Sequence, residues 1–331
     1  MNRVVRFHET GGPEVLRLEE VPVPSPGPGE VLICTRALGL NRAESMFRLG
    51  QYGYDPVFPS GLGYEASGEV EAVGAGVTGL AVGDAVSVVP SFKMTDYTVH
   101  GEHVLAPARA VVANPEGLSF EEAASVWMMF ITAYGGLIDL AHLGAGDTVL
   151  LPAASSSVGL AAIQIAHMVG ARAVALTRTS AKRQQLLDAG ADAVIATTEE
   201  DVVARVRELT GSNGARVVFD PIGGPALADL IRAAAQEGII VLYGVLDTEP
   251  APLDVLEVLF KHQTIRGFEM MEITLDDTRR RQAVDFVRDG LAKGDLTPVI
   301  DKTFPLDAIV DAHRYLEAGR QVGKVVVTVP R

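Results

Sequence analysis

The chain has 331 residues, of which 48% are hydrophobic and 21% charged, so it holds enough apolar material for globular cores. This composition excludes a disordered or fibrous protein, and the length favours two domains. The formal net charge is −14, which disfavours binding to nucleic acid or to anionic lipid headgroups. We therefore expect no nucleic acid and no membrane among the partners.

The cysteine content and the apolar stretches indicate a reducing compartment. Cys34 is the only cysteine, so neither an intramolecular disulfide nor a Cys₄ or Cys₂His₂ zinc site can form. The first residues lack the apolar block of a secretory signal. The uncharged stretch at residues 123–138 is shorter than the roughly 20 residues that span a bilayer. We expect a buried helix there and a cytoplasmic location.

Short runs typical of β-strands, broken by glycine and proline, extend from residue 4 to about residue 115. The strands predicted in this part are 4–7, 14–21, 30–38, 65–73 and 83–89. The first part of the chain is therefore predicted to be a mostly β unit.

The pattern changes at Ser119, where Glu122 three residues later forms a capping-box signature before a long apolar helix. Short apolar strands then alternate with helical segments. The predicted strands are 148–154, 173–178, 193–197, 217–222 and 239–245. Such alternation is typical of an α/β fold with a doubly wound parallel sheet.

The alternation stops after about Gly267, and two helices and a closing strand follow, at 276–294, 307–319 and 324–329. We expect these elements to return to the first domain. The predicted domains are thus 1–123 together with 267–331, and 124–266.

A candidate dinucleotide site lies where the strand 148–154 meets the following helix. Compared with G-x-G-x-x-G, this turn keeps only the last glycine, although small residues still let the backbone approach a phosphate. The predicted pyrophosphate-binding residues are Ser155, Ser156, Ser157, Val158 and Gly159. The alternative is an ordinary small-residue turn between a strand and a helix.

The end of the next strand indicates which cofactor is bound. Thr177 stands where an NAD-binding fold carries a carboxylate, and Arg178, Lys182 and Arg183 follow. A guanidinium can hold a 2′-phosphate bidentately, so we expect NADP(H). A solvated basic helix start is the alternative, but positive charge has the wrong sign there for the helix dipole.

Over nearly its whole length the chain resembles the medium-chain dehydrogenases/reductases, in particular their zinc-free, quinone-oxidoreductase-like branch. The segments that carry the resemblance are GGPEVL at 11–16, PGPGEVLI at 26–33, LNRAESMFRLGQY at 40–52, GYEASGEVEAVGAGV at 63–77, VGDAV at 82–86, AASSSVGLAAIQIA at 153–166 and FDPIGG at 219–224. The resemblance implies a Rossmann domain for NADP(H) at 124–266 and a mostly β, GroES-like catalytic domain in the rest.

The resemblance also implies that no catalytic metal is bound. Where zinc-dependent members carry a cysteine and a histidine as ligands, this chain has Asn41 and Tyr64, which are poor zinc ligands. The histidines are scattered through the sequence. His100 and His103 are expected to lack partner ligands nearby.

Without a Lewis acid, conjugate reduction is the natural reaction, because an enone or a quinone already spreads developing charge onto oxygen. The resemblance implies Tyr52, Tyr64 and Asn41 as catalytic candidates, and a phenol can donate to that oxygen at neutral pH. As alternatives, Asn41 is a helix N-cap with Glu44 three residues on, and the ring of Tyr52 only packs.

Further cofactor contacts are implied by position alone, at strand ends of the Rossmann domain and at the return to the first domain. They are Asn41, Thr132, Pro221, Tyr243, Gly244, Val245, Phe268 and Lys324. For Thr132 the alternative is a hydrogen bond back to its own helix.

Three functions remain open after the sequence has been read. The leading one is a zinc-independent, NADPH-dependent reductase of quinones or α,β-unsaturated carbonyls, which are small-molecule substrates. The others are a zinc-independent carbonyl or alcohol oxidoreductase and a non-catalytic NADPH-binding protein. The resemblance further implies a homodimer that pairs through the outer strand of the dinucleotide sheet, around 239–245 or the strand after it.

Overall fold

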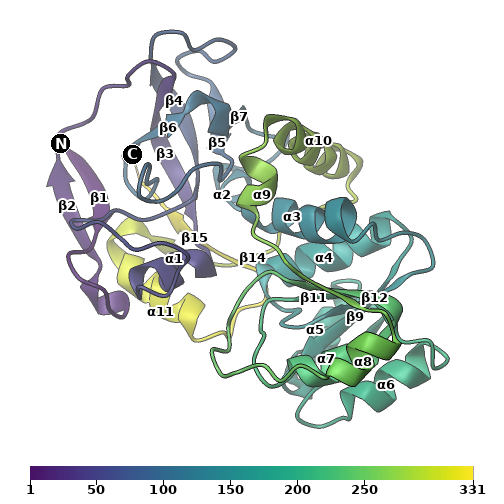
Figure 1. Cartoon of the computed structure of the whole chain (residues 1–331). Coiled ribbons are helices and arrows are strands. Elements are labelled where there is room, and N and C mark those ends of the chain that lie inside the picture. The colour runs from purple at the N-terminus through teal and green to yellow at the C-terminus, as the bar shows by residue number, and fades with distance from the viewer. Residues whose placement is uncertain (331) are drawn as a thin grey trace. The chain divides into compact units, whose positions relative to one another are not determined.

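The computed structural model describes residues 1–330 and contains two compact units (Figure 1). Unit 1 comprises residues 1–128, 274–277 and the chain from Pro298 onward. Unit 2 comprises residues 129–273 and 278–297. The chain therefore leaves the first unit, builds the second and returns, as its β, α/β and closing segments predict.

Unit 1 is built on a seven-stranded, mainly antiparallel sheet. Its strand order is β14 (Ile300–Pro305), β15 (Lys324–Thr328), β3 (Glu30–Gly39), β4 (Glu65–Val73), β5 (Ala85–Val88) and β7 (Val111–Ala113), with β6 (His103–Pro107) paired to β3. A separate pair is formed by β1 (Asn2–Arg6) and β2 (Arg17–Val21). The helices are α1 (Arg42–Arg48), α2 (Phe120–Ala123) and α11 (Ile309–Glu317). This is the GroES-like unit.

The closing strand β15 lies beside β3, so residues from the two ends of the chain are neighbours. Val326 pairs with Gly39 across these strands. A Cβ atom on Gly39 would lie 1.9 Å from the carbonyl oxygen of Ala124, so only glycine allows this backbone approach. The packing brings Lys324 next to the segment that follows β3.

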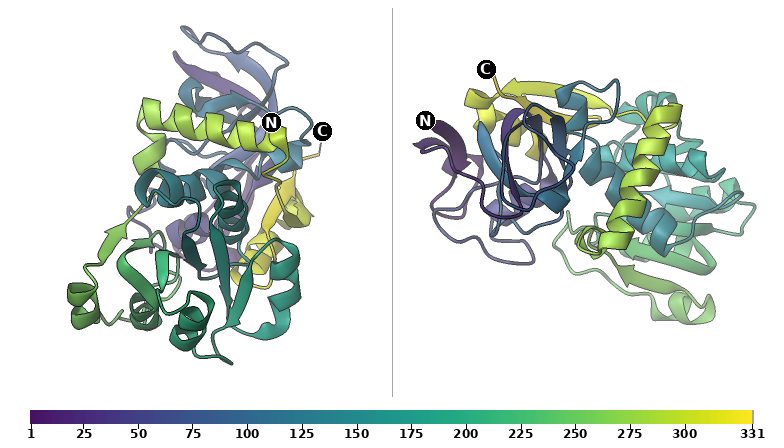
Figure 2. Two further views of the ribbon diagram at one scale, coloured as in Figure 1. Left: turned by 90° about the vertical axis from the view of Figure 1, so that its right-hand side faces the viewer. Right: turned by 90° about the horizontal axis from the view of Figure 1, so that it is seen from above.

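Unit 2 has a six-stranded parallel sheet with helices on both faces; α4 and α7 cover opposite faces (Figures 1 and 2). The strand order is β10 (Ala193–Ala196), β9 (Arg172–Thr177), β8 (Thr148–Leu151), β11 (Ala215–Asp220), β12 (Ala234–Leu242) and β13 (Thr264–Gly267), the order of a Rossmann fold. The helices are α3 (Trp127–Tyr134), α4 (Ser157–Met168), α5 (Arg183–Asp188), α6 (Val202–Leu209), α7 (Leu227–Ala233), α8 (Val255–Phe260), α9 (Met271–Thr274) and α10 (Asp277–Lys293).

The units divide the chain differently from the predicted domains, chiefly because α10 packs in unit 2. Arg279 forms an ion pair of 2.5 Å with Asp139, and the ring of Phe286 lies 4.8 Å from that of Tyr134. Of the segment after Gly267, mainly β14, α11 and β15 belong to unit 1. The first boundary lies between residues 128 and 129 rather than 123 and 124.

The apolar segment after Ser119 is a helical run from Phe120 to Leu140 that ends in a π-helical turn, Gly135–Leu140. It is long and apolar enough to cross a bilayer, but 78% of its apolar window is buried within the structure, as in a core helix. A Cβ on Gly136 would lie 2.2 Å from the ring of Phe219, so the helix packs tightly on the sheet of its unit.

Candidate active site

The predicted pyrophosphate turn connects β8 to α4. Ser156 is the N-cap of this twelve-residue helix, and its Oγ accepts a hydrogen bond from the backbone N–H of Gly159 at 3.1 Å. The first N–H groups of α4 and the positive end of its dipole lie at this turn, next to Ser155 and Ser157. The turn has the chemistry of an anion site at a helix N-terminus.

Gly159 allows the helix to approach the strand closely. A Cβ at this position would lie 2.5 Å from the carbonyl oxygen of Ala154, which excludes any larger residue. This is the packing role of the last glycine in a dinucleotide fingerprint. Ala153 adopts a φ of 50°, a left-handed conformation that is unusual for alanine, so the turn is also strained.

The basic residues after β9 have different surroundings. Lys182 Nζ donates to Ser155 Oγ at 3.1 Å, which ties its positive charge to the pyrophosphate turn. Arg178 is exposed just beyond Thr177, the last residue of β9. Arg183 instead donates to the carbonyl of Val194 at 2.6 Å and pairs with a neighbouring glutamate, so its role is structural. Arg178 and Lys182 therefore remain as the candidate phosphate ligands.

The ends of β11 and β12 converge on one tight turn. The carboxylate of Asp220 accepts hydrogen bonds from the N–H groups of Ile222 at 2.8 Å and Gly223 at 3.1 Å. Burial raises the pKa of Asp220, whereas these hydrogen bonds oppose the shift. A Cβ on Gly244 would lie 2.7 Å from the carbonyl oxygen of Pro221, so the two predicted contact segments touch.

The other predicted contacts in unit 2 lie at the following places. The ring of Tyr243 stacks on Phe219, with centroids 3.9 Å apart, and Val245 is exposed beyond it. Phe268 is buried directly after β13 and packs against Gly135, where a Cβ would come within 2.4 Å of its ring. Thr132 is buried in α3.

Asn41, the first catalytic candidate, is the N-cap of α1. The carboxylate of Glu44 accepts a hydrogen bond from the backbone N–H of Asn41 at 2.9 Å, so the N-cap interpretation is confirmed. The carboxamide has its own partners: Nδ2 donates to the Gly39 carbonyl at 3.1 Å and to Glu65 Oε2 at 3.0 Å. Its Oδ1 accepts from Lys324 Nζ at 2.6 Å.

Lys324 is therefore part of a buried polar network in unit 1. Its side chain is only 1% exposed, and Nζ lies 2.5 Å from Glu65 Oε2. The other oxygen of Glu65 accepts from the backbone N–H of Met128 at 2.8 Å. The ammonium thus has two oxygen partners, one on Asn41 and one on Glu65. Its hydrogen bonding in this network requires no cofactor.

Glu44 contacts this network by accepting a hydrogen bond from the backbone N–H of Asn41, and its side chain is fully buried. Burial is the main cause that raises its pKa to about 7, while the hydrogen bond from Asn41 and the charge of Lys324 oppose the shift. His100 Nε2 lies 3.8 Å from Glu44 Oε1, and the rings of His100 and His313 are 6.4 Å apart. Burial lowers the pKa of His100 to about 3 and that of His313 well below its usual value.

Three phenols form a hydrogen-bonded chain. Tyr64 is buried, and its hydroxyl lies 2.5 Å from that of Tyr54. The Tyr64 hydroxyl also donates to Tyr52 at 3.5 Å, a long contact. The backbone N–H of Met94 donates to the Tyr54 hydroxyl at 3.0 Å, which gives the chain a direction from Met94 through Tyr54 and Tyr64 to Tyr52. Burial and the neighbouring phenols raise the pKa of Tyr64, so it stays protonated.

Tyr54 is a site residue that the sequence motifs do not predict. It lies two positions after Tyr52 in the same glycine-rich loop, and their rings meet edge to face with centroids 5.1 Å apart. The ring of Tyr52 also packs on Phe47. The repeated tyrosines of the segment GQYGY were the only available signal.

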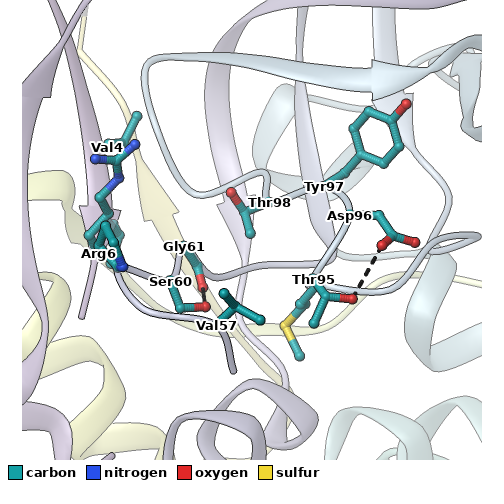
Figure 3. A pocket seen from close by; sticks show the side chains of 12 residues that line it. Val4, Arg6, Val57, Ser60, Gly61, Thr95, Asp96, Tyr97 and Thr98 are labelled. Atoms are coloured by element: carbon teal, nitrogen blue, oxygen red, sulfur yellow. Dashed lines mark hydrogen bonds between the residues drawn. The ribbon is translucent and has the colours of Figure 1, made fainter. Parts of the chain in front are cut away.

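A pocket of about 250 Å³ lies elsewhere in unit 1, beside β1 (Figure 3). Its walls come from β1, residues 57–61 and residues 94–98, with Arg6 and Asp96 as its charged side chains. None of the predicted site residues lines it. The pocket adjoins the candidate site only through Met94, whose N–H donates to Tyr54.

Comparison with known proteins agrees with both units. The model of the alcohol dehydrogenase GroES-like domain matches residues 27–134, and that of the zinc-binding dehydrogenases matches residues 157–289. Quinone oxidoreductase of Pongo abelii is 31% identical, over 98% of this chain and 97% of its own length.

Two solved structures share the fold over 99% of this chain and the whole of their own chains. One is a mycobacterial protein complexed with NADPH, 31% identical with a TM-score of 0.90. The other is described as an NAD-dependent alcohol dehydrogenase, 33% identical with a TM-score of 0.87.

A GroES-like unit joined to a Rossmann unit with a helix N-terminus at its glycine turn defines a two-domain oxidoreductase. The chain belongs to the medium-chain dehydrogenase/reductase superfamily, in its quinone-oxidoreductase-like branch.

Proposed function

We propose that this oxidoreductase reduces quinones or α,β-unsaturated carbonyl compounds with NADPH, without a catalytic metal. The observation that carries the proposal is the buried ammonium of Lys324, held at Asn41 and Glu65. Asn41 and Tyr64 stand at the positions where zinc-dependent relatives carry metal ligands. A cation that already bonds to the Asn41 oxygen opposes a second cation there, and a carboxamide and a phenol are poor zinc ligands.

The residues at the start of α4 fit a dinucleotide. Gly159 allows the close packing of helix and strand, and the first N–H groups of α4 are available to pyrophosphate oxygens. Lys182, which contacts Ser155, and the exposed Arg178 provide positive charge for a 2′-phosphate. These contacts support NADP(H) over NAD(H).

NADPH supplies the hydride when it is bound, and the substrate β-carbon or quinone ring receives it. The electron pair of the reduced bond then collects on the substrate oxygen, which needs a hydrogen-bond donor and finally a proton. We assign this donor to Tyr52, whose hydroxyl accepts a hydrogen bond from Tyr64 and is polarised by the chain that starts at Met94. Tyr64 and Tyr54 position the Tyr52 hydroxyl through this chain, and solvent restores the proton that the partly exposed Tyr52 gives up.

The experiment is a comparison of acceptors with metal-depleted enzyme. The protein is dialysed against a strong chelator, its metal content is measured, and NADPH oxidation is followed with an enone, a quinone and the saturated aldehyde that matches the enone. The proposal predicts turnover of the enone or the quinone at the rate seen before dialysis, and little turnover of the aldehyde. Activity that disappears with zinc and returns when zinc is added would contradict it.

A carbonyl or alcohol oxidoreductase is the second candidate, because one solved structure with 33% identity is described as an NAD-dependent alcohol dehydrogenase. In that case the saturated aldehyde would be the better acceptor. A protein that binds NADPH but oxidises it with no acceptor would have a non-catalytic role instead.

A further inference from the structure

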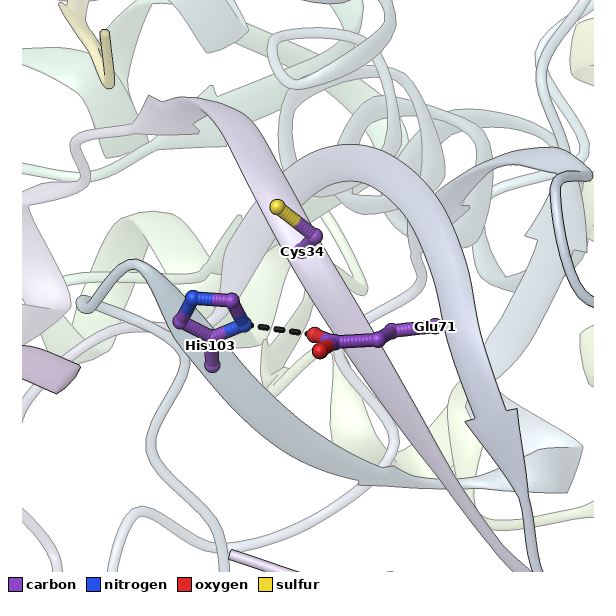
Figure 4. Close-up of side chains that lie close together, drawn as sticks. All are labelled: Cys34, Glu71 and His103. Atoms are coloured by element: carbon purple, nitrogen blue, oxygen red, sulfur yellow. Dashed lines mark hydrogen bonds and ion pairs between the residues drawn. The ribbon is translucent and has the colours of Figure 1, made fainter. Parts of the chain in front are cut away.

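A second group of chemically active side chains lies on the sheet of unit 1 (Figure 4). Cys34 in β3 pairs directly with His103 in β6, so both side chains project from the same face of the sheet. Glu71 in β4 lies beside them and is exposed, and the other two are partly exposed. Sulfur, nitrogen and oxygen donors from three neighbouring strands therefore meet at a surface that solvent reaches.

The backbone places Glu71 at this position. Leu32 pairs with Ala72 and Ile33 with Val70, so Glu71 is the extra residue of a β-bulge in β4. Bulges redirect a side chain relative to a regular strand and are common next to functional sites. The three side chains are thus carried by the rigid elements of a sheet.

The donor atoms are already close together. One atom from each of Cys34, Glu71 and His103 lies within 4.8 Å of the other two, and His103 Nδ1 lies 2.5 Å from Glu71 Oε2. Asn2 fixes the backbone of His103 on both sides: its Oδ1 accepts from the His103 N–H at 2.9 Å, and its Nδ2 donates to the His103 carbonyl at 2.7 Å. An ion bound here would replace the hydrogen bond between His103 and Glu71, with the sulfur of Cys34 as the third donor.

We propose that Cys34, His103 and Glu71 bind a divalent transition metal of the Zn²⁺ class. A thiolate, an imidazole and a carboxylate are the three ligand types that zinc accepts, whereas magnesium and calcium require oxygen ligands. Three protein ligands leave the fourth tetrahedral position to a water molecule. None of the three residues belongs to the proposed reductase site, so the metal is separate from the metal-free reduction.

From the sequence alone, no partner ligands are expected near His103. The expectation is wrong because the ligands are not close in sequence: Glu71 and His103 are 32 residues apart, and Cys34 lies on a third strand. Strand pairing brings them together. A simple surface pair of His103 and Glu71 is the competing explanation, and it predicts no role for Cys34.

Cobalt is the probe, because a cobalt–thiolate bond gives a charge-transfer absorption that imidazole and carboxylate ligands do not give. Chelator-treated full-length protein is titrated with Co²⁺ and then with Zn²⁺. We expect one equivalent of Co²⁺ to bind with the charge-transfer band, and Zn²⁺ to displace it in line with the usual order of affinities. Absence of the band from the unmodified protein would overturn the proposal.

Variants identify the ligands. Cys34→Ser should abolish the band, and His103→Gln and Glu71→Gln should each weaken Co²⁺ binding at least about tenfold. His8→Gln is the matched control, because His8 forms a similar surface pair with Glu19, at 2.6 Å, and should bind Co²⁺ like the unmodified protein. If Cys34→Ser keeps the band, or His8→Gln weakens binding as much as His103→Gln, the assignment is wrong. Circular dichroism of each variant verifies its fold.

Discussion

Lys324 donates a hydrogen bond of 2.6 Å to Asn41, although 283 residues separate them. The closing strand β15 carries the lysine to the residue that caps α1, next to Glu65. The predicted cofactor-binding role of Lys324 is not required by its surroundings, because the ammonium has buried oxygen partners in its own unit. Its position leads to a prediction about the stability of the fold.

Removing this ammonium should destabilise the fold strongly. Lys324→Met leaves the Glu65 carboxylate buried without its cation, and such a loss typically costs about 3–5 kcal/mol in the free energy of unfolding. Lys302→Met, at an exposed lysine of β14 whose ammonium lies over the rings of Phe304 and Tyr315, should change it by about 1 kcal/mol or less.

Urea unfolding measures both changes. The double variant Lys324→Met/Glu65→Gln should be destabilised less than Lys324→Met alone, because the unpaired charge is then absent. A loss for Lys324→Met no larger than that for Lys302→Met would show that the buried ion pair does not hold this network together.

Local patterns predicted most elements of the fold. The capping box at Asn41 and the glycine at 159 were readable because each depends on residues a few positions apart. The packing of α10 in unit 2 was not readable, because it depends on long-range contacts such as that of Arg279 with Asp139. An amphipathic helix indicates that it packs, but its sequence does not say against which unit.

The sequence predicted which residues belong to the candidate site better than it predicted the partners that their side chains contact. The places of Tyr52, Tyr64 and Asn41 followed from resemblance, but the partners of their side chains did not. Tyr54 entered the phenol chain through tertiary packing of one loop. Arg183, one of three basic residues after β9, turned inward to the carbonyl of Val194, and nothing in its sequence context distinguishes it from Lys182.

The second prediction concerns the cofactor. Arg178→Ala should weaken NADPH binding about tenfold or more while leaving NADH binding nearly unchanged, because it removes a charged contact to the 2′-phosphate alone. Lys182→Ala should also weaken NADPH binding, and NADH binding to a smaller extent, because Lys182 contacts Ser155 at the pyrophosphate turn as well. Arg207→Ala, at an exposed arginine of α6, makes the same change of charge and should have little effect. Titration of cofactor fluorescence measures all the affinities. Equal affinity of the unmodified protein for NADPH and NADH would contradict the assignment.

The third prediction concerns acid. The pKa of His100 is lowered to about 3 in the folded protein, and that of His313 is lowered as well. The unfolded chain therefore binds two more protons at these histidines as the pH falls below about 6.5, and folding stability is lost in that direction. Glu44 acts oppositely: its pKa of about 7 exceeds the usual 4.5, so its contribution to stability falls as the pH rises from 4.5 to 7.

From these three groups alone, the free energy of unfolding should fall as the pH drops below about 6.5, and more steeply below about 4.5, where Glu44 no longer opposes the histidines. Glu44→Gln should make the fall in the free energy of unfolding between pH 6.5 and 4.5 as steep as the fall below pH 4.5. The reason is that the variant lacks the carboxyl whose protonation opposes the effect of the histidines. His8→Gln, at an exposed histidine, should change neither slope. Urea unfolding between pH 4 and 7 gives the values; a Glu44→Gln profile parallel to that of the unmodified protein would be inconsistent with the buried carboxyl.

The fourth prediction is that the protein is a homodimer. The strand β13 is an edge of the parallel sheet, and apolar side chains of the neighbouring α8 are exposed, with Leu256 at 66% and Phe260 at 72%. An unpaired edge beside an apolar surface favours pairing with a second copy. Light scattering should give twice the chain mass of 35.0 kDa, and Phe260→Asp should lower it, whereas Leu187→Asp on α5 should not. A mass of one chain at micromolar concentration would reject the dimer.

The most direct test of the proposed chemistry is the rate of enone reduction by Tyr52→Phe in chelator-treated enzyme. If the Tyr52 hydroxyl stabilises the developing oxyanion, kcat should fall by on the order of 10²–10³, while the affinity for NADPH stays the same. Tyr97→Phe, which loses a hydroxyl bonded to Glu30 elsewhere in unit 1, should keep its kcat. Tyr52→Ala should in addition destabilise the loop by removing the ring. A Tyr52→Phe variant with unchanged kcat would show that this ring only packs and that Tyr52 is not the donor.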